Sequence, residues 1–156
     1  MTHKSDPRYT ITWDVFHQDI EHLAQKLDPL GPWERIIAVA RGGLAPAAYL
    51  SQRLNIRLVE TVCLASYFKE GAQSELEILK DIDDHVPGTL IVDDLVDSGK
   101  TFSFLKDRLP NAHRAVVYAK PRGQALADTL AREVEQEKWL VFPWEEKPFT
   151  CNNDLR

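Results

Sequence analysis

The sequence predicts an α/β protein whose mostly parallel central sheet is flanked by helices. The run at 36–40 is continuously apolar, as in a strand that is buried on both faces, and the runs at 58–66, 89–93 and 113–119 are further candidate strands. Segments with helical periodicity or composition separate several of these runs. Strands that alternate with helices favour right-handed crossovers, and therefore a parallel sheet.

The N-terminal part predicts a short strand followed by an amphipathic helix. Residues 9–12 form the candidate strand, and Thr12 is a favoured residue type for capping a helix that runs to about Leu27. The segment at 28–32 ends this helix, because it contains two prolines and a glycine. Apolar residues recur with the helical period and predict one buried face, made by Val15, Phe16, Ile20, Leu23, Ala24 and Leu27.

The rest of the chain continues this alternation. The glycines at 42 and 43 end the first long apolar run, and residues 68–74 have loop composition. A region rich in Trp and Pro follows the last run. The expected elements after the N-terminal helix are strand 36–40, helix 44–54, strand 58–66, strand 89–93, helix 100–108 and strand 113–119.

Length, charge and cysteine content limit the class of protein. A chain of 156 residues suits one domain, 1–156, which buries about two thirds of its unfolded surface. The formal net charge of −5 argues against broad nucleic-acid binding. The two cysteines, Cys63 and Cys151, are too few for a disulfide framework, and no apolar run suits a membrane span or a signal peptide. We therefore expect a cytoplasmic protein.

The segment LIVDDLVDSGKT at 90–101 carries the chemistry. An apolar strand leads into the adjacent carboxylates Asp93 and Asp94, then into Asp97, and a small-residue turn opens the next helix. Such a turn binds anions, because unpaired N–H groups and the helix dipole converge there. Carboxylates beside an anion suit sugar hydroxyls, a divalent cation or a substrate proton. The segment predicts a site for a phosphorylated sugar and its cation.

Competing explanations of this segment are weaker. A Walker A loop requires a glycine five residues before Gly99, where Asp94 stands, and no G-x-G-x-x-G fingerprint occurs in the chain. The remaining alternatives are structural: a solvated acidic turn at Asp93 and Asp94, and a helix cap at Asp97.

The segment 90–101 resembles the phosphoribosyl diphosphate motif of the type I phosphoribosyltransferases, and IIAVARGGLAP at 36–46 resembles their pyrophosphate loop. YTITWD at 9–14, TVCLASY at 61–67, YAKP at 118–121 and KWLVFPW at 138–144 are similar to the bacterial xanthine-guanine branch of the family. The similarity covers roughly residues 9–145 in collinear order. It implies the type I phosphoribosyltransferase fold, with a small hood built from the terminal segments, mainly 121–156.

The resemblance implies a purine salvage enzyme, a glycosyltransferase that uses Mg2+. It would transfer the 5-phosphoribosyl group from phosphoribosyl diphosphate to N9 of guanine or xanthine, with hypoxanthine as a further acceptor, and release pyrophosphate. Relatives are commonly cytoplasmic tetramers, and peripheral association with the inner membrane is an option. The alternatives are an enzyme that prefers hypoxanthine and guanine, and a regulator of transcription or RNA with the same fold. The acidic chain disfavours the regulator.

The resemblance also assigns roles to residues of the 90–101 segment. Asp93 and Asp94 would hold the ribose hydroxyls and Mg2+, and Asp97 would be the general base toward N7 of the purine. Glycine at 99 permits a turn that a side chain would obstruct. The 5-phosphate would be held by Ser98, Gly99, Lys100 and Thr101.

The diphosphate would be bound by Arg41, Gly42 and Gly43, and the family pattern predicts a cis peptide between Ala40 and Arg41. The loop at 68–74 lacks the arginine expected there, and Lys69 is the alternative contact to pyrophosphate.

The purine would be recognised by three further residues. Lys120 would face the 6-oxo group, Trp139 would stack on the ring, and the main chain of Leu140 would face the 2-position. Lys100 matches hypoxanthine-guanine members of the family, whereas xanthine-guanine members have glycine there. Trp144 is predicted to pack in the interior.

Overall fold

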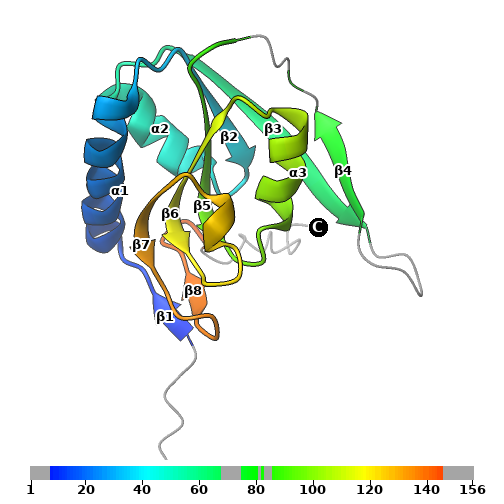
Figure 1. Ribbon diagram of the computed structural model, residues 1–156. Helices are drawn as coiled ribbons and strands as arrows, with labels where there is room; N and C mark the ends of the chain where they lie inside the picture. The colour runs from blue at the N-terminus through cyan, green and yellow to red at the C-terminus, as the bar shows by residue number, and fades with distance from the viewer. Residues whose placement is uncertain (1–7, 68–74, 81, 83–85, 146–156) are drawn as a thin grey trace, which may run out of the picture.

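The computed structural model describes residues 8–67, 75–80, 82 and 86–145. Among these residues, six strands form a central sheet with the order β4-β3-β2-β5-β6-β7 (Figure 1). Neighbouring strands are parallel except β3 and β4, which are antiparallel. The predicted fold class is therefore confirmed. The strands are β2 (Arg35–Ala40), β3 (Leu58–Tyr67), β4 (Glu75–Lys80), β5 (Thr89–Val96), β6 (His113–Ala119) and β7 (Thr129–Glu133).

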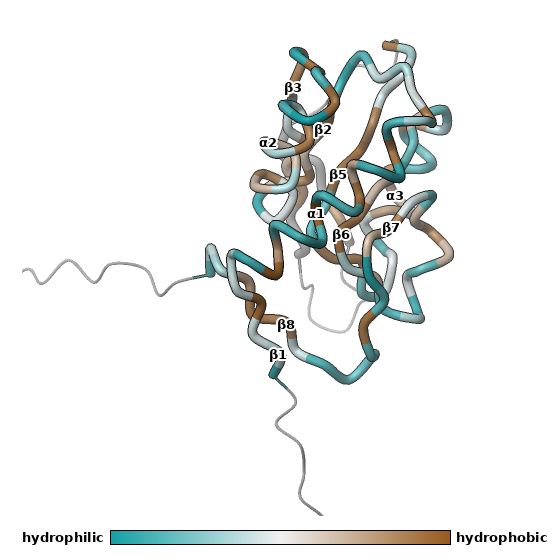
Figure 2. Tube along the Cα trace, turned by 90° about the vertical axis from the view of Figure 1, so that its left-hand side faces the viewer, coloured by the Kyte–Doolittle hydropathy of each residue, from teal (hydrophilic) through white to brown (hydrophobic). Residues whose placement is uncertain are grey.

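Helices cover both faces of this sheet. The helices α1 (Trp13–Leu27) and α2 (Leu44–Arg53) lie on one face, and α3 (Lys100–Arg108) lies on the other (Figure 1). Successive residues of β2 alternate between the two sides: Ile36 packs with the α1 and α2 side chains, whereas Ile37 packs with those of α3. Apolar side chains on both faces explain why β2 is a continuous apolar run. Figure 2 shows the apolar strands enclosed by more polar helices.

The N-terminal and C-terminal segments meet outside the main sheet. Strand β1 (Arg8–Thr10) pairs in parallel with β8 (Trp139–Val141), and the two lie side by side in Figures 1 and 2. The ring of Trp144 stacks on Phe142 with their centroids 4.8 Å apart, and Phe16 of α1 meets Trp144 edge-on. These contacts fix the segment that contains Trp139 against the body of the protein.

The predicted elements are present with similar bounds, whereas strands β4, β7 and β8 were not predicted. One boundary also differs at the site. Strand β5 continues to Val96, three residues beyond the predicted end, because Asp93, Leu95 and Val96 pair with residues of β6. The adjacent carboxylates therefore lie within a strand and not in the turn after it. Short 3₁₀ helices occur at Asp28–Leu30 and Gln124–Leu126. The predicted loop at 68–74 lies outside the described residues.

Candidate active site

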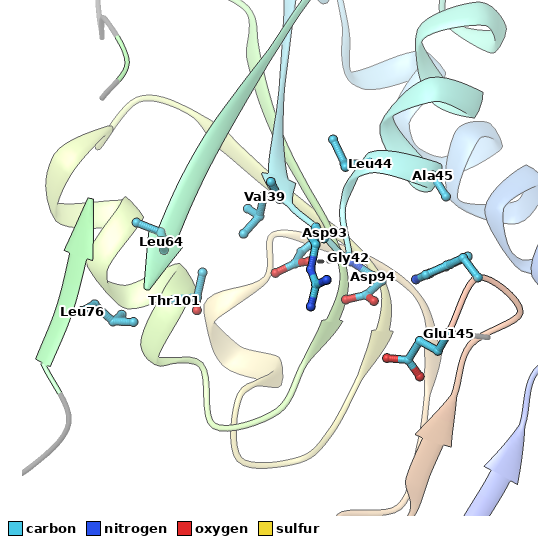
Figure 3. A pocket seen from close by; sticks show the side chains of 13 residues that line it. Val39, Gly42, Leu44, Ala45, Leu64, Leu76, Asp93, Asp94, Thr101 and Glu145 are labelled. Atoms are coloured by element: carbon cyan, nitrogen blue, oxygen red, sulfur yellow. Dashed lines mark hydrogen bonds between the residues drawn. The ribbon is translucent and has the colours of Figure 1, made fainter. Parts of the chain in front are cut away.

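The candidate site lies where the chain order of the sheet reverses. From the adjacent strands β2 and β5, the chain proceeds outward in opposite directions, to β3 and β4 on one side and to β6 and β7 on the other. Ligands of open α/β sheets bind beyond the carboxyl ends of strands at such a point. A cleft of about 790 Å³ opens there (Figure 3). An adjoining hollow of about 150 Å³ shares Asp93 and Thr101 with it.

The turn after β2 forms one wall of the cleft. Its peptide between Ala40 and Arg41 is cis, as predicted, and the exposed Arg41 lines the cleft. A Cβ at Gly42 would lie 2.5 Å from the Asp94 carboxylate, and a Cβ at Gly43 would collide with a backbone oxygen of β5. Glycine at both positions therefore lets this turn lie directly beside β5.

Asp93 and Asp94 lie at the floor of the cleft, next to Gly42 (Figure 3). Burial, and then the charge of Asp94, raise the pKa of Asp93 well above its ordinary range. Burial also raises the pKa of Asp94 to about 6, and the charge of Glu145 adds to this shift. A bound cation would stabilise the ionised forms of these two carboxyls, because its positive charge offsets their burial and their mutual repulsion. The described residues contain no cluster of three or more His, Cys, Asp or Glu side chains suited to a metal.

The loop between β5 and α3 forms the smaller hollow. Gly99 has a φ of 82° in the left-handed region, and a Cβ there would also collide with the Leu126 side chain. Ser98 and Lys100 are exposed and line the hollow, while Thr101 lines both the hollow and the cleft. The predicted phosphate loop therefore opens α3 at its N-terminus, where backbone N–H groups lack helical partners.

The predicted base and the predicted purine-selecting residue are in direct contact. Nζ of Lys120 lies 2.9 Å from Oδ2 of Asp97, and the Lys120 side chain is only 7% exposed. Nε2 of Gln136 donates to Oδ1 of Asp97 at 2.7 Å. Sequence reasoning missed Gln136, because a lone amide in a turn carries no recognisable pattern.

The segment at 139–145 contributes Trp144 and Glu145 to the cleft lining, which does not include the predicted purine-binding residues Trp139 and Leu140. Trp139 is 68% exposed on β8, whereas the Leu140 side chain is buried and its main chain pairs with β1. Trp144 packs as predicted, but it also lines the cleft, which was not predicted. Glu145, also not predicted, lies across the cleft from Asp94 (Figure 3). Lys69 lies outside the described residues.

Leu64 of β3 and Leu76 of β4 line the other side of the cleft (Figure 3). Nothing in their own segments marked them as site residues, because they enter the cleft through the antiparallel pairing of β3 with β4.

Paired carboxylates, a left-handed glycine and a helix N-terminus at the switch point are typical of an α/β protein with a ligand site at the carboxyl ends of its strands. The chain belongs to the phosphoribosyl transferase domain family, whose model matches residues 12–150. It is 45% identical over 137 residues to the xanthine-guanine phosphoribosyltransferase of Nitratidesulfovibrio vulgaris (strain DP4), an alignment that covers 88% of this chain and 84% of the relative.

Solved structures agree with this family. The purine phosphoribosyltransferase of Pyrococcus horikoshii Ot3 superposes with a TM-score of 0.80 at 31% identity, over 93% of this chain and 99% of its own. The xanthine-guanine-hypoxanthine phosphoribosyltransferase of Helicobacter pylori superposes with a TM-score of 0.73 at 25% identity, over 88% of this chain and 94% of its own.

Proposed function

We propose that this chain is a purine salvage enzyme of the xanthine-guanine phosphoribosyltransferase type. It transfers the 5-phosphoribosyl group from phosphoribosyl diphosphate to N9 of guanine or xanthine, and of hypoxanthine, and releases pyrophosphate. The observation that carries this proposal is the Lys120–Asp97 pair beside the phosphate loop. The xanthine-guanine relative, at 45% identity over most of the chain, supports the substrate class.

The sugar donor would be held from both ends. Backbone N–H groups and hydroxyls of residues 98–101 would bind the 5-phosphate at the start of α3. The exposed guanidinium of Arg41 would bind the diphosphate bidentately. As pyrophosphate leaves, C1 of the ribose gains oxocarbenium character and negative charge grows on the diphosphate. A positive group fixed beside the leaving oxygens therefore stabilises the transition state more than the ground state.

Asp93 and Asp94 would hold Mg2+ together with the ribose hydroxyls. The pair fits a hard cation, because the two carboxyls are adjacent and burial favours their uncharged forms unless a positive group compensates. When bound, Mg2+ would supply charge neutralisation for the diphosphate. The cation would share its coordination with ligand oxygens.

The purine edge complements the Lys120–Asp97 pair. A 6-oxopurine carries an acceptor at O6 and a proton at N7 on one edge, which matches an ammonium donor next to a carboxylate acceptor. Asp97 would take the N7 proton as N9 attacks C1, and Lys120 would donate to O6. The exposed face of Trp139 would stack on the ring, and the main chain of Leu140 would face the 2-position.

We also propose that residues 1–156 form one phosphoribosyltransferase domain, with a hood contributed mainly by 121–156. The pairing of β8 with β1 supports the hood. Family resemblance supports a cytoplasmic homo-oligomer, a tetramer, with peripheral association at the inner membrane as an option. No helix among the described residues is long and apolar enough to cross a membrane.

Steady-state assays with phosphoribosyl diphosphate and Mg2+ test the proposed function. We expect turnover with guanine, xanthine and hypoxanthine, and little with adenine or orotate. Asp97→Asn should lower kcat by about 10²–10⁴-fold, the usual range for a positioned base, while the matched variant Asp107→Asn, at an exposed position on α3, should behave as wild type. A preference for orotate or adenine, or no turnover with any base, would contradict the proposal. Turnover within about threefold of wild type in Asp97→Asn would leave Asp97 as a structural partner of Lys120 and Gln136 and not the base.

A further inference from the structure

We propose that Gln136 is a positioning residue that holds the Asp97 carboxylate in its working orientation. This inference rests on the proposed function, in which Asp97 receives the N7 proton. Nε2 of Gln136 donates to Oδ1 of Asp97 at 2.7 Å, while Lys120 donates to Oδ2 at 2.9 Å. Each oxygen of the Asp97 carboxylate therefore accepts one hydrogen bond. The two donors come from different segments of the chain, and together they fix the plane of the carboxylate.

The chemistry of its partners fixes the direction of the Gln136 amide. The backbone N–H of Arg122 can only donate, and it lies 3.0 Å from Oε1 of Gln136. The opposite end of the amide faces Asp97, whose carboxylate accepts when it is ionised. The amide oxygen therefore points to Arg122 and its NH2 group to Asp97. A glutamate at position 136 would keep the bond to Arg122 but place a second acceptor against Asp97.

Asp97 needs such a contact because its own surroundings constrain it little. Its side chain is 53% exposed, and it follows β5 at the start of the phosphate loop. Lys120, its other partner, is also assigned to the purine 6-oxo group. Gln136 carries no purine contact in the proposed mechanism, so its bond to Asp97 can persist while Lys120 serves the substrate. A misaligned base loses rate because proton transfer requires near-ideal geometry.

The turn that holds Gln136 is itself fixed in place. Between β7 and β8, the Val134 N–H donates to Ala119 O at 2.9 Å and the Lys138 N–H donates to Glu135 O at 3.2 Å. Trp139 begins β8 directly after this turn. Gln136 thus links the hood segment that bears the proposed stacking residue to the proposed base.

The test compares Gln136→Glu and Gln136→Leu with wild type in guanine assays. We expect both variants to lose about tenfold in kcat, the effect of one hydrogen bond to a charged group. Gln136→Glu should lose at least as much as Gln136→Leu, and KM for phosphoribosyl diphosphate should stay within about twofold. Gln124→Leu is the matched control, because Nε2 of Gln124 also donates to a carboxylate, that of Glu133, at 2.7 Å but outside the site.

The double variants with Asp97→Asn separate positioning from mere folding. If Gln136 acts through Asp97, Gln136→Leu should lower kcat by less than about twofold in the Asp97→Asn background. A Gln136→Glu variant as active as wild type would overturn this inference but not the proposed function, because the variant keeps the contact to Arg122 and loses the donor to Asp97. Faster turnover in Gln136→Leu would also overturn it, because the contact would then be one that the purine must displace. An inactive wild type would remove the proposed function and this inference with it.

Discussion

Gly42 faces Asp94 so closely that a Cβ at position 42 would lie 2.5 Å from both carboxylate oxygens. The turn after β2 and the acidic end of β5 are therefore in contact across the switch point of the sheet. In the proposed function, this contact brings the diphosphate-binding turn next to the carboxylates that serve the ribose and Mg2+.

Gly42→Ala should damage the site while the fold persists. The clashing atoms belong to the end of the Asp94 side chain, which can rotate away, so the strain displaces a ligand-binding group and leaves the core in place. We expect kcat/KM for phosphoribosyl diphosphate to fall by about tenfold or more, with little change in Tm. Unchanged kinetics would show that the Asp94 carboxylate has no fixed role in this position.

Asp94→Asn should stabilise the metal-free protein and inactivate it. Burial raises the pKa of Asp94 from its ordinary value of 3.8 to about 6. Because its pKa is raised in the folded state, the Asp94 carboxyl contributes fully to the free energy of unfolding below pH 3.8, where it is protonated in both states. This contribution is lost as the pH rises through about 6 and the buried carboxyl must ionise. An amide removes the charge, so Asp94→Asn should gain on the order of 1–2 kcal/mol at pH 7.5.

Thermal unfolding in EDTA between pH 4 and pH 8 measures this effect. The Tm difference between Asp94→Asn and wild type should grow as the pH rises through about 6. Asp107→Asn, at an exposed position on α3, is the matched control and should show no such trend. A difference that is constant with pH would contradict the titration of Asp94.

Local patterns were enough to predict much of this architecture. Helix α3 begins at Lys100 and ends at Arg108, as predicted, and β2 differs from its predicted range by one residue. These elements follow from periodicity and glycine placement, which act over a few residues. Asp93, Asp94 and Asp97 could likewise be predicted as site residues, because the carboxylates and the small residues of the turn follow one another within the single segment 90–101.

Features that depend on distant partners were not predictable in the same way. Strand β8 is only three residues long and exists through its pairing with β1 at the opposite end of the chain. Asp19 lies on the buried face of α1, where the pattern favours an apolar residue. Tyr118 and Arg132 donate to Asp19 at 2.7 Å and 2.6 Å from β6 and β7, which makes its burial tolerable.

Arg41→Ala should reveal the diphosphate contact. The guanidinium forms a charge-assisted interaction that strengthens as pyrophosphate departs, so its loss should lower kcat as well as raise KM for phosphoribosyl diphosphate. We expect a combined loss of about tenfold to hundredfold in kcat/KM. Arg57→Ala is the matched control, since Arg57 is exposed just before β3, away from the carboxyl ends of the strands. An effect confined to KM for the purine would contradict this role.

Lys120→Ala should change the choice of base. The O6 of guanine accepts from the Lys120 ammonium, whereas the 6-amino group of adenine would place a donor against a donor. Leaving this buried charged donor without a substrate acceptor costs about 1–3 kcal/mol, so wild type should prefer guanine over adenine by about tenfold or more in kcat/KM.

Removal of the ammonium takes away the penalty on adenine together with the benefit to guanine. Activity of Lys120→Ala with guanine should therefore fall steeply, activity with adenine should fall much less, and the ratio of the two kcat/KM values should collapse. The exposed Lys106 of α3 provides the control, and Lys106→Ala should keep the wild-type ratio. If Lys120→Ala retains the full guanine preference, the selecting group lies elsewhere. The main chain near Trp139 and Leu140 is then the next segment to test, because β8 holds it in place through its pairing with β1.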